Sequence, residues 1–278
     1  MKIQLLGVRG STSAPGLNYV RYGGHTACAA IPRPDGRWLI LDAGTGFRRV
    51  DELLKGDVLR GTLLVSHMHW DHTEGLPFLP NADRPGADVH MYIPAQEDGR
   101  AAVDVVAETM QPPSFPIRPE QLGGTWKFSN LEPGTYEMEG LEITAAEVHH
   151  KGGRTYGFRI VEGSSVIVYL PDHAFADASD ELRNDAIELC RDADLLFHDS
   201  QFLDTQREIA TAYAHSTISD SLELARLAHV KHLVLFHHAP NRTDAQLDDI
   251  EAQFATPNGS VTVAREDDIY EVPEAAPH

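Results

Sequence analysis

Residues 66–72 read Ser-His-Met-His-Trp-Asp-His and carry three imidazoles and one carboxylate directly after an apolar run. Packing alone does not require so many metal-coordinating groups in so short a stretch. In an extended segment side chains alternate, so His67, His69 and Asp71 are expected on one side, with His72 reaching in from the following turn. One ion cannot easily take four ligands from such a loop, so the spacing predicts two ions. We interpret the segment as part of a metal-dependent enzyme and not as a solvated histidine-rich turn.

Four apolar runs of the sequence each end in potential ligands. Residues 62–65 lead to His67, residues 141–148 to His149 and His150, residues 166–170 to Asp172, and residues 233–236 to His237 and His238. In open α/β architectures, functional groups gather at the carboxyl ends of strands, where the loops meet. The four runs together predict one site that is built from four loops.

The elements that must position this site follow from periodicity and capping signals. Further strands are expected at residues 3–6, 38–41, 89–93, 157–161, 194–197 and 261–264, and helices at residues 101–109, 180–191, 219–228 and 244–254. Thr243 and Gln246 form a capping box for the last helix, and Thr217 is a candidate cap for the helix before it. Both halves of the chain mix strands with helices, which predicts α/β layers and not a helix bundle.

Composition limits the class of protein. The chain has 278 residues, of which 42% are hydrophobic, enough for a large core. No apolar run approaches the roughly 20 residues of a membrane span, and the start is too short in its apolar part to be a secretory signal. Cys28 and Cys190 give no disulfide framework. We therefore expect a cytoplasmic protein in a reducing compartment with no membrane association.

The charge balance limits the partners. A formal net charge of −19 and the lack of a Lys/Arg cluster disfavour a long RNA or DNA substrate, because non-specific affinity for nucleic acid comes from cationic contacts with phosphates. A small phosphate-bearing substrate is compatible with this charge, since metal ions neutralise it locally. We expect a small-molecule partner, no stable nucleic-acid partner and, in solution, a homodimer as the commonest assembly.

Together these residues resemble the metallo-β-lactamase superfamily, whose signature His-x-His-x-Asp-His is met by residues 67–72. The closer resemblance is to its branch of phosphodiesterases and ribonuclease Z-like nucleases. The matching segments are residues 7–11 (Gly-Val-Arg-Gly-Ser), 41–46 (Leu-Asp-Ala-Gly-Thr-Gly), 75–78 (Gly-Leu-Pro-Phe), 110–116 (Met-Gln-Pro-Pro-Ser-Phe-Pro) and 215–217 (His-Ser-Thr). The resemblance implies a single domain over residues 1–278, folded as a four-layer αβ/βα sandwich.

The resemblance also implies a ligand set. By motif position, one metal is bound by His67, His69 and His150, the other by Asp71, His72 and His237, and Asp172 bridges the two. His150 is preferred over His149 because it precedes the turn at Gly152 and Gly153. His237 is preferred over His238 because it follows the strand immediately. Ligation by nitrogen and oxygen alone suits Zn²⁺ and also admits Mn²⁺ or Fe.

His215 is the next candidate, as a catalytic residue. On spacing alone it is equally well a loop histidine near a helix start, but the His-Ser-Thr match implies that it faces the scissile phosphate and helps the leaving oxygen depart. Asp199 resembles the acidic partner of that histidine in this branch. Lys151 and Arg154 are candidate contacts to a second anionic group of the substrate, although exposed loop cations are commonly only solvated.

The chain departs from the family pattern in two informative places. His25 stands where close relatives carry asparagine, and we find no inserted basic arm of the kind that tRNA 3′-processing enzymes use. The second departure, together with the acidic composition, disfavours tRNA processing. The β-lactamase activity that names the superfamily is also not expected.

The predicted reaction is hydrolysis of a small phosphodiester, such as a cyclic nucleotide, by a hydroxide held between two ions about 3.5–4 Å apart. Asp71 would orient that hydroxide, and His215 would protonate or stabilise the leaving oxygen. The alternative is hydrolysis of a carboxylic ester or lactone by the same site. It is disfavoured because no tyrosine is placed obviously to polarise a carbonyl. A non-catalytic sensor or di-iron redox protein is a third alternative.

Substrate selection is expected in a lid-like segment at about residues 96–128. There, Phe115 either stacks on a base or aryl group or simply packs the lid down. We expect the aromatic side chains of Trp38, Trp70 and Phe78 to lie in the core and not to contact ligands.

Overall fold

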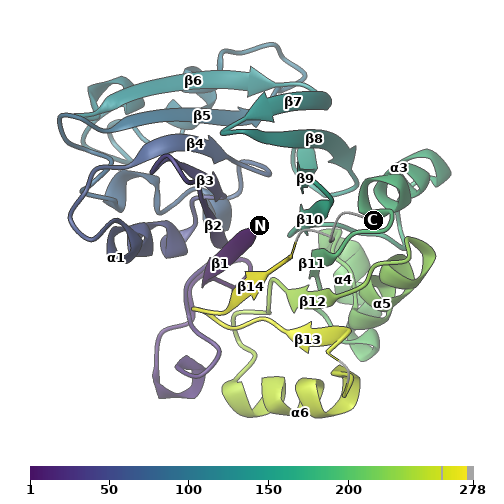
Figure 1. Ribbon diagram of the computed structural model, residues 1–278. Coiled ribbons are helices and arrows are strands. Elements are labelled where there is room, and N and C mark those ends of the chain that lie inside the picture. The colour runs from purple at the N-terminus through teal and green to yellow at the C-terminus, as the bar shows by residue number, and fades with distance from the viewer. Residues whose placement is uncertain (258, 274–278) are drawn as a thin grey trace.

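The computed structural model describes residues 1–257 and 259–273, and two seven-stranded sheets face each other in it (Figure 1). The first sheet has the order β14-β1-β2-β3-β4-β5-β6 and the second β13-β12-β11-β10-β9-β8-β7. The strands of the first sheet are β1 (Lys2–Gly7), β2 (Cys28–Pro32), β3 (Trp38–Leu41), β4 (Arg60–Leu64), β5 (Asp88–Pro94), β6 (Thr125–Leu131) and β14 (Ile269–Glu271). Those of the second are β7 (Gly134–Met138), β8 (Leu141–Val148), β9 (Thr155–Glu162), β10 (Ser165–Leu170), β11 (Leu195–Asp199), β12 (Leu233–Phe236) and β13 (Val261–Val263).

Helices cover the outer faces of both sheets. They are α1 (Val50–Leu54), α2 (Ala102–Ala107), α3 (Asp180–Cys190), α4 (Arg207–Tyr213), α5 (Ile218–Leu227) and α6 (Asp244–Phe254). Short 3₁₀ turns span Leu17–Tyr19, Thr45–Arg49, Trp70–His72, Leu76–Phe78, Pro119–Gln121 and Asp204–Gln206. The capping box predicted at Thr243 is present, because the Gln246 side chain accepts from the Thr243 amide at 2.9 Å. Thr217 is the N-cap of α5, as predicted.

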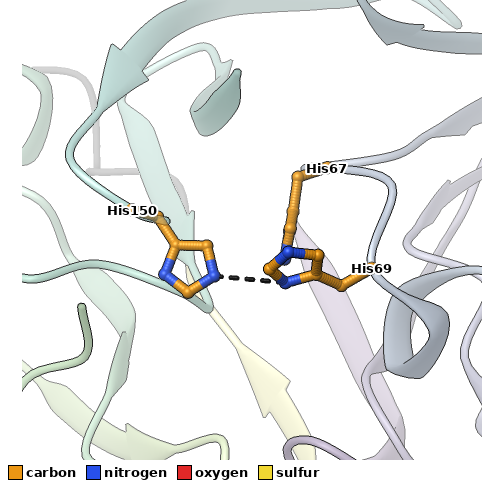
Figure 2. Close-up of side chains that lie close together, drawn as sticks. All are labelled: His67, His69 and His150. Atoms are coloured by element: carbon orange, nitrogen blue, oxygen red, sulfur yellow. Dashed lines mark hydrogen bonds between the residues drawn. The ribbon is translucent and has the colours of Figure 1, made fainter. Parts of the chain in front are cut away.

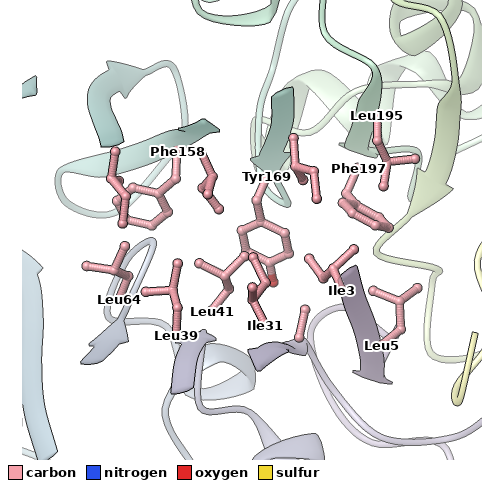
Figure 3. Packing of buried hydrophobic residues seen from close by; sticks show 14 of the residues in the cluster. Ile3, Leu5, Ile31, Leu39, Leu41, Leu64, Phe158, Tyr169, Leu195 and Phe197 are labelled. Atoms are coloured by element: carbon pink, nitrogen blue, oxygen red, sulfur yellow. The ribbon is translucent and has the colours of Figure 1, made fainter. Parts of the chain in front are cut away.

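Three apolar clusters hold these layers together. The first lies between the sheets, where side chains of β1, β2, β3 and β4 meet those of β9, β10 and β11 (Figure 3). The second lies between the first sheet and α1 with α2, and the third between the second sheet and α3, α5 and α6. The central strands of both sheets are therefore buried on both faces, which explains their nearly continuous apolar sequences. The predicted four-layer αβ/βα sandwich is confirmed.

Some predicted boundaries agree with the structure, and some elements of the structure were not predicted. Residues 38–41, 141–148, 233–236 and 244–254 match β3, β8, β12 and α6, whereas β2, β6, β7, β14, α1 and α4 were not predicted. The segment predicted as a lid contains α2 and one 3₁₀ turn, and its last four residues form the start of β6. Within the described residues, no helix is both long and apolar enough to cross a membrane.

Candidate metal centre

Two groups of ligand atoms meet where the loops after β4, β8, β10 and β12 converge. The first group is His67, His69 and His150, whose ligand atoms lie within 4.8 Å of one another. Figure 2 shows the three rings turned toward each other, with His150 Nε2 at 3.3 Å from His69 Nδ1. His150 donates from Nδ1 to the Ala214 carbonyl at 2.7 Å, which leaves Nε2 free for an ion. His67 Nε2 is buried without a hydrogen-bond partner.

The second group is Asp71, His72 and His237. Asp71 Oδ2 lies 3.2 Å from His237 Nε2 and 3.3 Å from His72 Nε2, and these two ring nitrogens are 3.3 Å apart. All three side chains are buried. The ligand atoms of this group also lie within 4.8 Å of one another, so a single ion could contact all three.

Asp172 lies between the two groups. Its Oδ2 is 2.7 Å from His72 Nε2 and 3.1 Å from His237 Nε2, and its Oδ1 is 3.7 Å from His150 Nε2. Asp172 Oδ2 is buried and has no partner in hydrogen-bond geometry despite these near nitrogens. One carboxylate therefore faces both groups, as the predicted bridging role requires.

The charge of the centre fits divalent cations. Burial lowers the pKa of His67 well below its usual value and that of His150 to about 4, so both rings are neutral, which is the metal-binding form of imidazole. Burial would lower the pKa of His72 too, but Asp71, Asp172 and Asp42 outweigh it and raise that pKa well above the usual value. A raised pKa on a fully buried imidazole indicates that the carboxylates around it carry an excess of negative charge. Divalent ions would neutralise that excess, so the residues present fit the metals that the family pattern implies.

The backbone is specialised around the second group. His237 has a φ of 61°, a left-handed conformation that is uncommon outside glycine. A Cβ at Gly10 would lie 2.3 Å from His237 Cε1, so only glycine leaves room for this ring. Ser11 donates its backbone N–H to Asp71 Oδ2 at 2.5 Å. The loop after β1 thus shapes the site through its backbone at Gly10 and Ser11.

Asp42 was not predicted as a site residue, although it orients one of the ligands. Its Oδ2 accepts from His72 Nδ1 at 2.7 Å, from the Tyr169 hydroxyl at 2.9 Å and from Ser66 Oγ at 3.0 Å. Its Oδ1 accepts from the Ser66 amide at 2.7 Å. Asp42 fixes His72 with Nε2 toward the centre. A signal was present, because Asp42 directly follows a strand as the predicted ligands do.

His215 and Asp199 form a buried pair beside the centre. His215 donates from Nδ1 to Asp199 Oδ2 at 2.7 Å, and the same nitrogen lies 3.3 Å from Asp172 Oδ1. Burial would lower the pKa of His215, but the carboxylates of Asp199, Asp172 and Asp71 together outweigh it and raise the pKa to about 9. Asp199 is held in place by the backbone amides of Gln201 and His173, at 3.0 and 3.1 Å. The relation predicted between His215 and Asp199 is therefore present in the structure.

The neighbouring histidines have structural roles. His238 donates from Nε2 to the Ala264 carbonyl at 2.9 Å, on the side away from the centre. His149 accepts with its carbonyl from the Ala174 amide at 2.8 Å, and its side chain is absent from the ligand groups among the described residues. The structure thus brings His150 and His237 to the centre, as the predicted choices require.

The alternation predicted for residues 67–71 is wrong. Trp70–His72 is a 3₁₀ turn and not extended chain, so Asp71 does not share a side with His67 and His69. Instead the turn brings Asp71 next to His72 and His237 in the second group. The division of ligands between two ions is unaffected.

The expectation that Trp70 and Phe78 lie in the core is also wrong. Trp70 is 72% exposed and Phe78 is 58% exposed, while Trp38 packs against the second apolar cluster as predicted. Phe115 is half-buried and contacts Phe78 edge to face, with ring centroids 5.9 Å apart. Trp70 lines the pocket over the metal centre together with His69, Lys151 and Tyr213.

The two cationic side chains that were predicted to contact the substrate, Lys151 and Arg154, lie in different pockets. Lys151 lines the pocket over the centre and donates from Nζ to the Ala212 carbonyl at 3.0 Å. Arg154 is bound to the carboxylates of Glu147 and Glu132, at 2.8 and 3.1 Å. Arg154 lines a separate pocket with Glu147, so the structure does not bring it to the metal centre.

Comparison with known proteins agrees with this geometry. A family model described as the beta-lactamase superfamily domain matches residues 37–238. The ribonuclease Z of Listeria monocytogenes serotype 4b is 28% identical over 221 residues, covering 63% of this chain and 69% of its own. The metallo-beta-lactamase fold protein YhfI from Bacillus subtilis superposes with a TM-score of 0.72 at 19% identity, over 97% of this chain and 99% of its own. A diphosphatase from the PhnP family has the same TM-score at 20% identity and 98% coverage of both chains. The match over residues 37–238, which includes the ligand segments after β4, β8, β10 and β12, places this chain in the beta-lactamase superfamily.

Proposed function

We propose that this protein is a hydrolase that uses two divalent metal ions to cleave phosphoric diesters, and that its substrates are small molecules. The observation that carries the proposal is the single buried carboxylate of Asp172 facing two groups of ligands at once. Two ions held in this way, when bound, supply Lewis acidity and lower the pKa of water to about 7. The similarity to proteins named ribonuclease Z and diphosphatase supports cleavage at phosphorus.

The chain's own residues then have distinct tasks. The first group, which includes His67, and the second, which includes His72, would hold the ions, and Asp172 would contribute its carboxylate to both groups. Asp71 is fixed by the Ser11 amide and would orient the attacking water toward phosphorus. Because the ligand atoms come from four loops on rigid strands, the reacting groups are held in place before substrate arrives.

His215 is the proposed general acid. Its Nδ1 is engaged by Asp199, so the proton available to substrate is the one on Nε2. The charge and hydrogen bond of Asp199 raise the pKa of His215, which favours retention of that proton at neutral pH. His215 lines the pocket over the metal centre and would pass the proton to the leaving oxygen.

A small substrate is favoured over an RNA by the charges around the pocket. Within the described residues, Lys151 is the one Lys or Arg among the side chains that line it, and the whole chain carries a net charge of −19. Binding of a long polyanion draws on several cationic contacts with phosphates. The relatives named ribonuclease Z make an RNA substrate the competing possibility. Comparison of a precursor tRNA with a panel of cyclic and linear nucleotide diesters tests it.

One observation keeps the carboxylic ester or lactone alternative as a second candidate. Tyr213 lines the pocket over the centre and is 62% exposed, so a hydroxyl group is present near the site, contrary to the sequence-based expectation. Such a hydroxyl could polarise a carbonyl. Activity toward bis(p-nitrophenyl) phosphate and p-nitrophenyl acetate distinguishes the two, and Tyr213→Phe would lower only the second if the alternative were right.

The experiment that tests the main proposal combines metal analysis with activity. We expect two divalent ions per chain, chiefly Zn²⁺, by elemental analysis of the purified protein. Removal by a chelator should abolish hydrolysis of bis(p-nitrophenyl) phosphate, and added Zn²⁺ or Mn²⁺ should restore it. A protein that is fully active with fewer than two ions per chain would refute the proposal. The single-domain organisation, the cytoplasmic location and a homodimer remain predictions.

A further inference from the structure

A second pocket, the aromatic slot, opens beside the metal centre. It has a volume of about 260 Å³, and the side chains that define it are Met68, Trp70, Phe78, Val106, Met110 and Phe115. A cavity of about 150 Å³ suffices to bind benzene in a protein interior. The slot therefore has room for a ring system next to the reacting centre.

The slot adjoins the pocket over the metal centre, with which it shares two lining residues. Met68 and Trp70 line both pockets. In the chain, Trp70 stands directly between His69 and Asp71, which belong to different ligand groups. A molecule whose reacting group lies at the two ligand groups would reach the slot across the Trp70 side chain, which lines both pockets.

The aromatic rings of the slot are unusually exposed. Trp70 and Phe78 are among the few large apolar side chains of the described chain that are mostly solvent-accessible. Phe78 is held from one side by the edge-to-face contact with Phe115, which itself packs against the second apolar cluster. Adjacent exposed apolar side chains mark binding surfaces more often than chance placement does. Their rings offer faces and edges for stacking on another aromatic group.

The charges around the slot define what it accepts. Its polar lining includes the carboxylates of Glu74 and Glu108, and no Lys or Arg is among its lining residues in the described chain. A second phosphate or carboxylate of the substrate would be repelled there. A flat, uncharged or weakly basic ring would not. Lys151 lines the metal pocket but not the slot.

We propose that the aromatic slot binds a planar, uncharged ring carried by one ester arm of the substrate, so the substrates are diesters with an aryl or nucleobase-bearing arm. This inference rests on the proposed phosphodiesterase function and specifies its substrate class. Trp70 and Phe78 supply the stacking faces, and the neighbouring metal centre receives the phosphoryl group. The ring of the substrate contributes to its binding affinity and takes no part in bond cleavage.

Binding is measured directly by calorimetry on the zinc-loaded protein with two phosphonates that differ only in the group bound to phosphorus. Phenylphosphonate should bind about tenfold or more tightly than methylphosphonate, the range expected for stacking of one ring. Trp70→Ala and Phe78→Ala should each reduce this ratio toward one. Phe78 is not adjacent to a ligand in sequence, so its variant remains informative if Trp70→Ala loses metal. Leu17→Ala, which removes a 90% exposed side chain outside the slot, is the control and should keep the ratio.

Hydrolysis then identifies the source of the ring. With p-nitrophenolate as the common leaving group, the kcat/KM of phenyl and thymidine-5′ diesters is compared with that of the methyl diester. Preference for one over the other assigns the slot to an aryl or a nucleobase arm. Equal binding of the two phosphonates, binding of neither, or a ratio unchanged in both slot variants would overturn the slot proposal. If the wild-type protein still hydrolyses bis(p-nitrophenyl) phosphate in that case, the proposed function stands. If the wild-type protein shows no metal-dependent hydrolysis of this diester, the proposed function itself is refuted.

Discussion

Asp42→Asn should weaken metal binding although Asp42 contacts no ion. In the native chain the Asp42 carboxylate accepts from His72 Nδ1 at 2.7 Å, so the proton of the ring stays on Nδ1 and Nε2 is left for coordination. An asparagine that turns its amide nitrogen to the position of Oδ2 would face three donors: His72, Tyr169 and Ser66. Hydroxyl groups can rotate to accept. The imidazole must instead move its proton to Nε2, which then cannot bind an ion.

The size of this effect follows from the number of contacts that change. Loss of a partner that orients a metal ligand typically costs about 10- to 100-fold in metal affinity or activity. We expect the upper part of this range, because the carboxylate is fully buried and one oxygen serves three donors. This range corresponds to about 1.4–2.7 kcal/mol of binding free energy. Asparagine tolerates the left-handed backbone at Asp42, where φ is 60°, so the variant avoids the strain that alanine would add.

The assay is competition for Zn²⁺ with a chromophoric chelator, which resolves the two ions by affinity, together with kcat/KM for bis(p-nitrophenyl) phosphate. The matched control is Tyr169→Phe, which removes one hydrogen bond to the same oxygen without changing the His72 tautomer. It should cost less than Asp42→Asn in metal affinity. If Asp42→Asn binds both ions with native affinity, the orienting role is wrong. If both variants lose the same affinity, packing and not the tautomer is responsible.

Three further predictions concern Asp172 and His215 of the site and Glu266, whose carboxylate accepts from the His25 amide outside the metal centre. Asp172→Ala should lower both metal content and turnover, because it removes the carboxylate that faces both ligand groups; full metal content with full turnover would contradict the bridging assignment. His215→Ala should keep two ions and lose about 10²–10⁴-fold in kcat for diesters with alkoxide leaving groups, and less for p-nitrophenolate, which needs no proton. Burial raises the pKa of Glu266 from an ordinary 4.5 to about 7, so the folded state loses stability as the pH rises through that interval. The Tm of Glu266→Gln minus the Tm of the native protein should therefore increase from pH 5 to pH 8.

Much of the site was predictable because its ligands follow strands. Strands β8, β10 and β12 run in the same direction and bring their carboxyl ends to one edge of the second sheet, and the loop after β4 reaches the same place from the first sheet. To predict the role of Asp42 from the sequence, one must also know that β3 pairs with β4. Their parallel register sets Leu41 beside Leu64 and thereby brings Asp42 to Ser66. A sequence pattern identifies strands but does not state which strands are neighbours.

The unpredicted elements have local physical reasons. The strand β2 contains two alanines at its centre and shows no alternation, since both of its faces are buried. The strand β14 has three residues and exists because its partner β1 lies at the other end of the chain, with Ile3 opposite Tyr270. Such a strand gains its hydrogen bonds only after the two ends of the chain meet. Short-range propensity therefore carries little information about it.

The error at Trp70 shows where a general rule of burial fails. Large apolar side chains are usually buried, which is why Trp70 and Phe78 were expected in the core. In a ligand loop, however, the inward side is already taken by His67 and His69, because their ring nitrogens must reach the metals. Trp70, between His69 and Asp71, faces outward, whereas Met68, between His67 and His69, is half-buried and also packs against the second apolar cluster. Met68 and Trp70 consequently line the mouths of the metal pocket and the aromatic slot. An apolar residue placed between two metal ligands is thus a candidate for substrate contact before it is a candidate for the core.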